Sequence, residues 1–237
     1  MNEHFVTAEI GTNWNGDYYN LRKMVHKCAI AGVDAVKFQC LSEELIDRHC
    51  ELDWYRHASL SEQNIGNIMS ICVEYGISFY ASVTYPDAAR ILAPFVDYYK
   101  IRVADSENEE IWESIISNIR IQRKNLGKNQ KIIVSSTRPI PQKFYDKDPD
   151  TDIINLYCIP QYPTRLGEIN FDMLKNPEFE GYSNHCTDVT ALMKAVRHGA
   201  KYLEFHISND LDSFAIDNKV SLSYTQMEEF MKWLRKS

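Results

Sequence analysis

A strand–helix–strand repeat sets the class of fold, and its first copy is HFVTAEIGTNWNGDYYNLRKMVHKCAIAGVDAVKFQC (residues 4–40). Residues 4–11 and 35–40 are short apolar and β-branched runs with the length of a buried strand. Residues 18–31, which lie between them, repeat apolar side chains at the three- and four-residue spacing of a helix. The segment therefore predicts two strands that pair in parallel through a crossover helix.

The same alternation continues along the rest of the chain. Amphipathic stretches at helical spacing follow at residues 61–75, 107–121, 188–198 and 223–236. Eight strands alternating with helices predict parallel pairing, and eight such units close naturally into a (β/α)8, or TIM, barrel of the α/β class. The eight strand candidates are residues 4–11, 35–40, 78–83, 98–103, 131–136, 154–159, 180–184 and 202–208.

One of these units is irregular. Residues 138–153 contain three prolines and an acid-rich turn, so we expect the fifth helix to be shortened or missing. An open doubly wound sheet is the alternative architecture, but no G-x-G-x-x-G sequence opens a helix after a predicted strand. Because α/β barrels of about 200–250 residues commonly form one domain, we expect a single catalytic barrel over residues 1–237.

The composition is that of an ordinary globular protein, with 44% hydrophobic and 25% charged residues. A formal net charge of −7 and a pI near 5.5 argue against nucleic acid as a partner. No apolar run approaches the roughly 18 residues of a membrane span, and the N-terminal residues lack signal-peptide features. We therefore expect no membrane partner. The six cysteines include no C-x-x-C pair, which favours a reduced, cytoplasmic protein.

Charged side chains occur inside strands that a barrel should bury. Lys37 and Lys100 each lie within such a strand, where an ammonium group is costly unless it is paired with an anion. Gln39 and Arg102 lie two residues further on and therefore face the same side as the lysines. Cations and hydroxyls that converge on a barrel mouth suit a phosphate and a carboxylate. The other polar residues near predicted strand ends are Glu9, Asn13, Asn15, Ser135, Ser136, Thr137, Tyr162, Ser183, Asn184, His185, Glu204 and His206.

Two of these residues are histidines that end consecutive strands. His185 follows the seventh strand candidate and His206 lies near the end of the eighth, so their imidazoles can approach one divalent ion. Neutral imidazole suits Mn, Fe, Co or Zn. Two histidines do not fill a coordination shell, so oxygen atoms of substrate and water would have to complete it.

Six segments are distinctive because of their order along the chain. They are AEIGTNWNGDYYNLRKMVHKCAIAGVDAVKFQ (8–39), YKIRVAD (99–105), VSST (134–137), YPT (162–164), GYSNHCTD (181–188) and GAKYLEFHIS (199–208). Together they resemble the sialic acid synthase family, the phosphoenolpyruvate-condensing enzymes that make nonulosonic acids. The catalytic domain of that family is a (β/α)8 barrel, which agrees with the independent count of strands.

The resemblance implies a role for each matching residue. Lys37, Gln39 and Lys100 match residues that hold phosphoenolpyruvate and neighbouring substrate groups, and Ser136 and Ser183 match residues that contact the same substrate. These positions imply phosphoenolpyruvate as the first substrate.

The remaining matches concern the acceptor sugar and a metal ion. Glu9 matches an active-site carboxylate near the acceptor, Tyr162 an acceptor-site tyrosine, and Asp217 an acceptor-binding aspartate. His185 and His206 match the metal ligands, and the metal is usually Mn²⁺, with Mg²⁺ or Co²⁺ as alternatives. The resemblance implies catalytic roles for Glu9 and for both histidines.

The chain also departs from the family pattern. Trp14 replaces a histidine, Val103 a small residue, Arg138 a glycine and Pro160 an asparagine. The C-terminal antifreeze-like domain of the family is not found in these 237 residues. We therefore expect an altered acceptor site, closed by a homodimer partner or by a separate antifreeze-like lid protein.

The expected reaction joins phosphoenolpyruvate to an open-chain aldose or amino sugar, releases phosphate and gives a 2-keto-3-deoxy acid. Arg102 and Arg138 are expected to bind an anionic group of the acceptor or of phosphoenolpyruvate, since guanidinium matches carboxylate and phosphate. Two alternatives remain open. One is a Schiff-base aldolase or lyase that uses Lys37 or Lys100 as nucleophile. The other is a barrel that binds a sugar or anion without catalysis.

Overall fold

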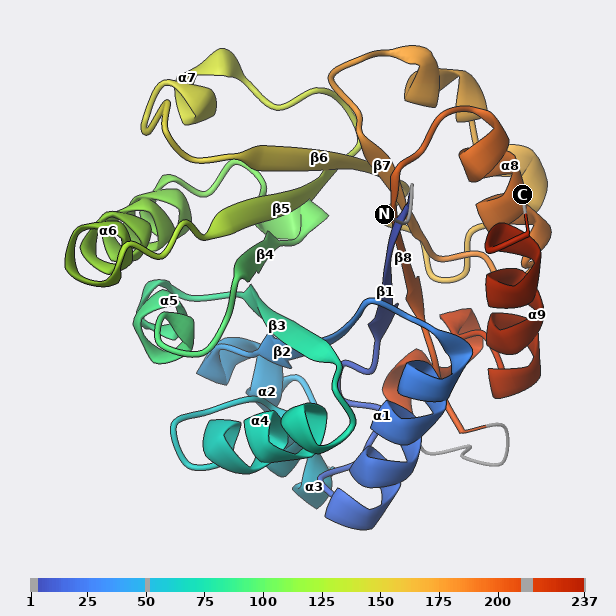
Figure 1. Cartoon of the computed structure of the whole chain (residues 1–237), viewed down its shortest axis with the longest axis horizontal. Helices are drawn as coiled ribbons and strands as arrows, with labels where there is room; N and C mark the ends of the chain where they lie inside the picture. Colours follow the sequence, from blue (N-terminus) through green and yellow to red (C-terminus); the bar gives the residue numbers. More distant parts are fainter. Residues whose placement is uncertain (1–3, 50–51, 210–214, 237) are drawn as a thin grey trace.

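The predicted barrel is confirmed. The structure is a computed structural model that describes residues 4–49, 52–209 and 215–236. Its eight parallel strands are hydrogen-bonded in sequence order, and β8 closes the ring by pairing with β1 (Figure 1). The strands are β1 (Phe5–Glu9), β2 (Ala35–Cys40), β3 (Ser78–Val83), β4 (Tyr98–Ile101), β5 (Lys131–Ser136), β6 (Ile153–Cys158), β7 (Gly181–Asn184) and β8 (Tyr202–His206).

Helices cover most of the outside of the barrel. In α1 (Tyr18–Ala31), Asp17 caps the N-terminus by accepting a hydrogen bond from the Tyr19 amide at 2.9 Å, and Gly32 ends the helix with a φ of 80°. No helix in the described part of the chain is long and apolar enough to cross a membrane. The other helices of this layer are α4 (Ile65–Glu74), α5 (Pro86–Leu92), α6 (Glu109–Leu126), α8 (Thr190–Arg197) and α9 (Tyr224–Leu234), with short α2 (Glu43–Asp47) and α3 (Asp53–Ala58) between β2 and α4.

The fifth unit is shortened, as the prolines indicate. Its helix α7 (Gln142–Tyr145) has four residues, and Phe144 stacks on Trp112 of α6 with ring centroids 4.7 Å apart. The sixth unit is irregular too, which the sequence analysis did not predict. Only the 3-10 turns η2 (Leu166–Glu168) and η3 (Phe171–Lys175) connect β6 to β7.

The inside of the barrel changes character along its axis. At the N-terminal ends of the strands, the ring of Phe5 packs against those of Tyr98 and Tyr202, with centroids 5.3 and 5.8 Å apart. At the opposite end, the register pairs Glu9 of β1 with Lys37 of β2 and with His206 of β8. Side chains two residues apart point the same way, so each of these strands carries an aromatic or small residue at one end and a charged one at the other.

Candidate active site

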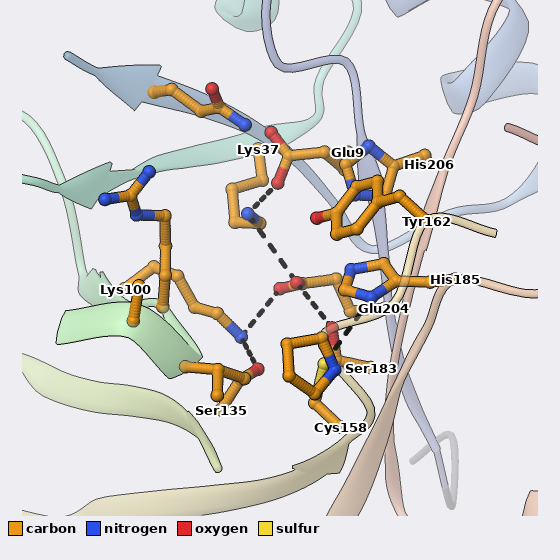
Figure 2. A pocket seen from close by; sticks show the side chains of 15 residues that line it. Glu9, Lys37, Lys100, Ser135, Cys158, Tyr162, Ser183, His185, Glu204 and His206 are labelled. Atoms are coloured by element: carbon orange, nitrogen blue, oxygen red, sulfur yellow. Dashed lines mark hydrogen bonds and ion pairs between the residues drawn. The ribbon is translucent and has the colours of Figure 1, made fainter. Parts of the chain in front are cut away.

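A cavity of about 300 Å³ opens at the C-terminal ends of the strands, where barrel enzymes place their chemistry (Figure 2). Every strand except β3 contributes to its wall, directly or through the residues just beyond the strand. The lining residues are Glu9, Lys37, Gln39, Lys100, Arg102, Val103, Ala104, Ser135, Cys158, Pro160, Tyr162, Ser183, His185, Glu204 and His206.

Lys37 projects into this cavity from β2 and is only 3% exposed. Its ammonium pairs with the Glu9 carboxylate, lies 3.6 Å from Glu204 Oε1 and donates to Ser82 Oγ at 3.3 Å. Burial lowers the pKa of Lys37 to about 8, against a partial opposing effect of Glu204. Lys37 therefore carries its charge at neutral pH but is unusually close to losing it.

Glu204 connects the two lysines (Figure 2). Its Oε2 lies 3.1 Å from Lys100 Nζ, and its Oε1 accepts a hydrogen bond from Ser183 at 3.0 Å. Lys100 also donates to Ser135 Oγ at 2.6 Å. Burial alone would raise the pKa of Glu204, but Lys100 and Lys37 outweigh it and lower this pKa to about 2. The floor of the cavity is thus a buried network of two ammonium groups around one carboxylate.

Glu9 occupies the wall next to this network and is fully buried. Gly11, two residues later, has a φ of 53°, a left-handed conformation that favours glycine. A Cβ at Gly11 would lie 3.0 Å from Glu9 Oε1 and 3.4 Å from Gln39 Nε2. The glycine therefore leaves room for both side chains to turn into the cavity.

The two histidines lie on the adjacent wall, with ring centroids 5.4 Å apart. His185 Nδ1 lies 2.8 Å from the carbonyl oxygen of Ile159, which can only accept, so Nδ1 carries the proton of the neutral ring and Nε2 keeps its lone pair. Burial, with His206 nearby, lowers the pKa of His185 to about 4, so the ring is neutral at pH 7. The Cys158 thiol lies 3.8 Å from the same Nδ1, and burial raises its pKa to about 12.

His206 faces a carboxylate that comes from outside the barrel wall. Asp217 Oδ2 lies 3.4 Å from His206 Nδ1, although Asp217 follows the end of β8 by eleven residues. Burial would raise the pKa of Asp217, but His206, His185 and Lys37 together outweigh it and hold that pKa below its ordinary value. The ring of Tyr162 covers both imidazoles, with centroids 4.1 Å from His185 and 5.8 Å from His206 (Figure 2).

This donor set fits a metal ion with two protein ligands. His185 is neutral and has its second ring nitrogen tied to a carbonyl, and His206 has Asp217 behind it, the arrangement usual for ligating histidines. In residues 4–49, 52–209 and 215–236, no group of three or more His, Cys, Asp and Glu side chains could hold a metal. Oxygen atoms of water and substrate would therefore have to supply the remaining ligands.

Asp217 does not line this cavity, but its carboxylate lies 3.4 Å from His206, which does. Nine of the predicted site residues line the cavity directly. They are Glu9, Lys37, Gln39, Lys100, Arg102, Tyr162, Ser183, His185 and His206.

Two predicted residues lie elsewhere. Ser136 Oγ donates to Asn155 Oδ1 at 2.7 Å, and its neighbour Ser135 faces the main cavity instead. Arg138 is exposed and pairs with Glu107 at 2.7 Å. Ser136 and Arg138 both line a separate small cavity of about 30 Å³. The substrate roles predicted for these two residues stay predictions without support from their positions.

The sequence analysis names Glu204 and Ser135 near strand ends but assigns neither of them a role in the site. Glu204 lies two residues before His206 in a buried strand, so alternation alone places both on the inner face. Ser135 faces inward because it lies two residues beyond Ile133, which the register pairs with Lys100. Two consecutive serines do not reveal by themselves which of them faces inward. Arg102 and Val103 both line the cavity because β4 ends at Ile101 and the chain turns into the 3-10 helix η1 (Val103–Asp105).

Comparisons with known proteins agree with this picture. The NeuB family profile matches residues 24–237. The N-acetylneuraminate-9-phosphate synthase of Mus musculus is 26% identical over 258 residues, covering 98% of this chain and 69% of that protein. The N,N'-diacetyllegionaminic acid synthase of Legionella pneumophila is 21% identical, covering 98% of this chain and 71% of that protein.

Solved structures confirm the fold. The crystal structure of N-acetylneuraminic acid (sialic acid) synthetase from Leptospira borgpetersenii, in complex with citrate, matches with a TM-score of 0.84 at 21% identity, over 98% of this chain and 83% of that one. A truncated 3-deoxy-D-arabino-heptulosonate 7-phosphate synthase from Thermotoga maritima matches with a TM-score of 0.72 at 13% identity, over 99% and 87%. Because the family profile covers most of the chain, the resemblance is confirmed: this protein belongs to the NeuB family, the family of the sialic acid synthases, and is an enzyme of that kind.

Proposed function

We propose that this enzyme condenses phosphoenolpyruvate with an open-chain aldose or amino sugar, releases phosphate and forms a nonulosonic-type 2-keto-3-deoxy acid. The observation that carries this proposal is the pair of buried ammonium groups, Lys37 and Lys100, held on either side of Glu204 at the floor of one cavity. Cations are rarely buried without an anion to bind or a catalytic task. A small molecule with several negative charges suits this floor once a divalent cation joins it, because Glu9 and Glu204 already face the two lysines.

Phosphoenolpyruvate would bind with its phosphate and carboxylate toward the lysines. Lys100 and Lys37 neutralise charge, and the Ser135 and Ser183 hydroxyls add hydrogen bonds from β5 and β7. Arg102 lines the cavity, and its Nε donates to Asp105 Oδ2 at 2.7 Å, a bond that does not use the two terminal nitrogens of the guanidinium group. These contacts fix the substrate while its third carbon faces the acceptor.

The acceptor would lie nearer the opening, between Glu9, Gln39 and Tyr162. Carbon 3 of phosphoenolpyruvate attacks the aldehyde carbon, water adds at carbon 2, and the bond between carbon 2 and the bridging oxygen breaks as phosphate leaves. Glu9, already paired with Lys37, is placed to take or return a proton of the acceptor or of the attacking water. Lys37 stabilises Glu9 in its ionised form during this exchange.

His185 and His206 would hold the divalent metal, for which we propose Mn²⁺, with Mg²⁺ or Co²⁺ as alternatives. When bound, such an ion polarises a carbonyl group and lowers the pKa of bound water. The charges of the cavity favour a bound metal ion, because each cation there already has an anionic partner. The pairs are Lys37 with Glu9, Lys100 with Glu204, and Arg102 with Asp105. Further positive charge is needed before a trianion binds well.

The Schiff-base alternative is weaker for a physical reason. Imine formation needs a neutral amine. Burial lowers the pKa of Lys37 to about 8, but this still leaves Lys37 mostly charged at neutral pH. Both lysines contact Glu204, and Lys37 also pairs with Glu9. Borohydride reduction in the presence of pyruvate checks it, since an aldolase would gain the mass of a trapped adduct on Lys37 or Lys100. Our proposal predicts no adduct.

The deciding experiment measures phosphate release from phosphoenolpyruvate in the presence of Mn²⁺ across a panel of aldoses and N-acyl amino sugars. The proposal expects release that depends on one class of sugar, with an equimolar 2-keto-3-deoxy acid detected by mass spectrometry. The variant Lys100→Met should lose this activity, while Arg138→Gln, outside the cavity, should keep it. Binding of phosphoenolpyruvate without turnover on any sugar would favour the non-catalytic alternative.

The rim is the least enclosed part of the cavity. Tyr162, which covers the two histidines, is 41% exposed. A homodimer partner or a separate antifreeze-like lid protein would exclude water there, and both stay proposals. Sedimentation of the protein with and without substrates distinguishes a homodimer from a monomer that needs another protein.

A further inference from the structure

Asp217 reaches His206 from a segment that is not part of the barrel wall. This segment, residues 215–222, contains the 3-10 helix η4 (Ile216–Val220) and returns alongside the end of β8. The Leu222 amide donates to the His206 carbonyl at 2.8 Å. The position of the Asp217 carboxylate therefore depends on how firmly this segment is docked against the barrel.

Asn13, from the connection between β1 and α1, is fully buried against this segment. Its Nδ2 donates to the Ile207 carbonyl at 2.8 Å and to Ser221 Oγ at 3.2 Å. Its Oδ1 accepts from the backbone amide of Asp217 at 3.2 Å. One side chain thus holds both ends of η4, although it is 204 residues away from Asp217 in the sequence.

The remaining hydrogen bonds of the segment are mostly local. Ser221 Oγ donates to the Asp217 carbonyl at 2.7 Å, and Ser208 Oγ donates to Asn218 Oδ1 at 2.5 Å. These bonds shape the segment and tie it to the end of β8, but they do not tie it to β1. Asn13 supplies that connection, and its own side chain does not line the cavity.

We infer that Asn13 is a positioning residue of the active site: it docks η4 so that Asp217 holds the His206 imidazole in its ligating orientation. The consequence for metal binding rests on the proposed function, because it assumes that His206 is a ligand. The docking itself does not. Groups behind a metal ligand commonly contribute 10- to 100-fold in metal affinity or activity, and Asn13 would act one step further out.

The matched control is Asn64, another buried asparagine that ties a loop together. Its Oδ1 accepts from the Ser61 amide at 2.8 Å, and its Nδ2 donates to the carbonyls of Ser59 and His57 at 2.8 and 3.2 Å. Asn13→Ala and Asn64→Ala both remove three hydrogen bonds and should both lower Tm. Only the first should disturb the segment that carries Asp217.

The experiment combines Mn²⁺ titration by calorimetry, without substrates, with hydrogen exchange of peptides covering residues 215–222. We expect Asn13→Ala to weaken Mn²⁺ binding by about 10-fold and to speed exchange in these peptides. Asn64→Ala should change the Mn²⁺ Kd by less than about twofold and speed exchange only around its own loop. If Asn13→Ala does not fold, Ser221→Ala removes one of the same hydrogen bonds and should show a smaller change in the same direction.

A double-mutant cycle separates positioning from general destabilisation. If Asn13 acts through Asp217, then Asn13→Ala should have little further effect on Mn²⁺ affinity in an Asp217→Ala background. Equal losses in both backgrounds, or wild-type exchange at residues 215–222 in Asn13→Ala, would overturn the inference. Failure of the proposed function looks different: His206→Ala would bind Mn²⁺ like the wild type, and the exchange data would still decide whether Asn13 docks the segment.

Discussion

The two ends of the barrel interior are made by the same strands but differ in the side chains that fill them. At the N-terminal end, Phe5, Tyr98 and Tyr202 fill the space with aromatic rings, and a few residues further along these strands Glu9, Lys100 and Glu204 fill it with charge. The aromatic end stabilises by burying apolar area. The charged end gains little or nothing for stability, because desolvation of buried ions offsets their attraction. This contrast supports the proposal that the charged end binds substrate and carries the chemistry.

The largest expected effect concerns the histidines of the charged end. Replacing both His185 and His206 by Ala should abolish binding of Mn²⁺ by calorimetry, because no imidazole would remain among the described residues that line the cavity. A conservative change at the aromatic end, Tyr98→Phe, should leave metal binding unaltered. Unchanged metal content in the double histidine variant contradicts the assignment.

The next effect concerns affinity for phosphoenolpyruvate. Lys37→Met and Lys100→Met each remove a charge that faces the bound anion, and charge-assisted hydrogen bonds contribute about 1.5–3 kcal/mol, or about 10- to 150-fold in Kd. Tyr202→Phe, at the aromatic end, should bind phosphoenolpyruvate like the wild type. Equal affinities in all three variants would remove the reason for placing this substrate between the lysines.

A third prediction uses the buried neutral histidine. The pKa of His185 is lowered to about 4 from its ordinary value of 6.5. As the pH falls from 6.5 to 4, the unfolded chain binds a proton at His185 that the native state does not, so the free energy of unfolding decreases by up to about 3 kcal/mol. His185→Gln should flatten the stability curve in this window. Urea denaturation at several pH values measures the slope, and an unaltered slope in the variant would assign the loss to other groups.

The sequence reveals some features of the fold and of the site and leaves others hidden. The barrel follows from hydrophobic periodicity, and Lys37 and Lys100 stand out because an ammonium inside a buried strand needs an explanation. The inward face of Ser135 rather than Ser136 depends on register, which the two serines do not encode. The approach of Asp217 to His206 depends on where residues 215–222 dock against the barrel, and no short-range pattern predicts such a contact. The sixth unit has 3-10 turns in place of an α-helix, because Pro160, Pro163 and Pro177 interrupt the segment between β6 and β7.

The smallest expected effect compares two arginines that the sequence analysis treated alike. Arg102 lines the cavity, whereas Arg138 lies outside it in an exposed pair with Glu107. Arg102→Gln should raise KM for the acceptor or for phosphoenolpyruvate several-fold, consistent with one partly exposed guanidinium contact. Arg138→Gln should leave both KM values unchanged in steady-state kinetics. A larger effect at Arg138 would show that the binding surface extends to the small cavity around Ser136.

The most direct test of the account follows the bridging oxygen of phosphoenolpyruvate. With ¹⁸O at that position, Mn²⁺ and a reactive aldose, the account predicts that the label leaves in inorganic phosphate and that an unlabelled 2-keto-3-deoxy acid forms in equal amount. Attack of carbon 3 on the aldehyde, with cleavage between carbon 2 and the bridging oxygen, requires this distribution. Phosphate without the label, or label retained in pyruvate with no condensed product, would contradict the account.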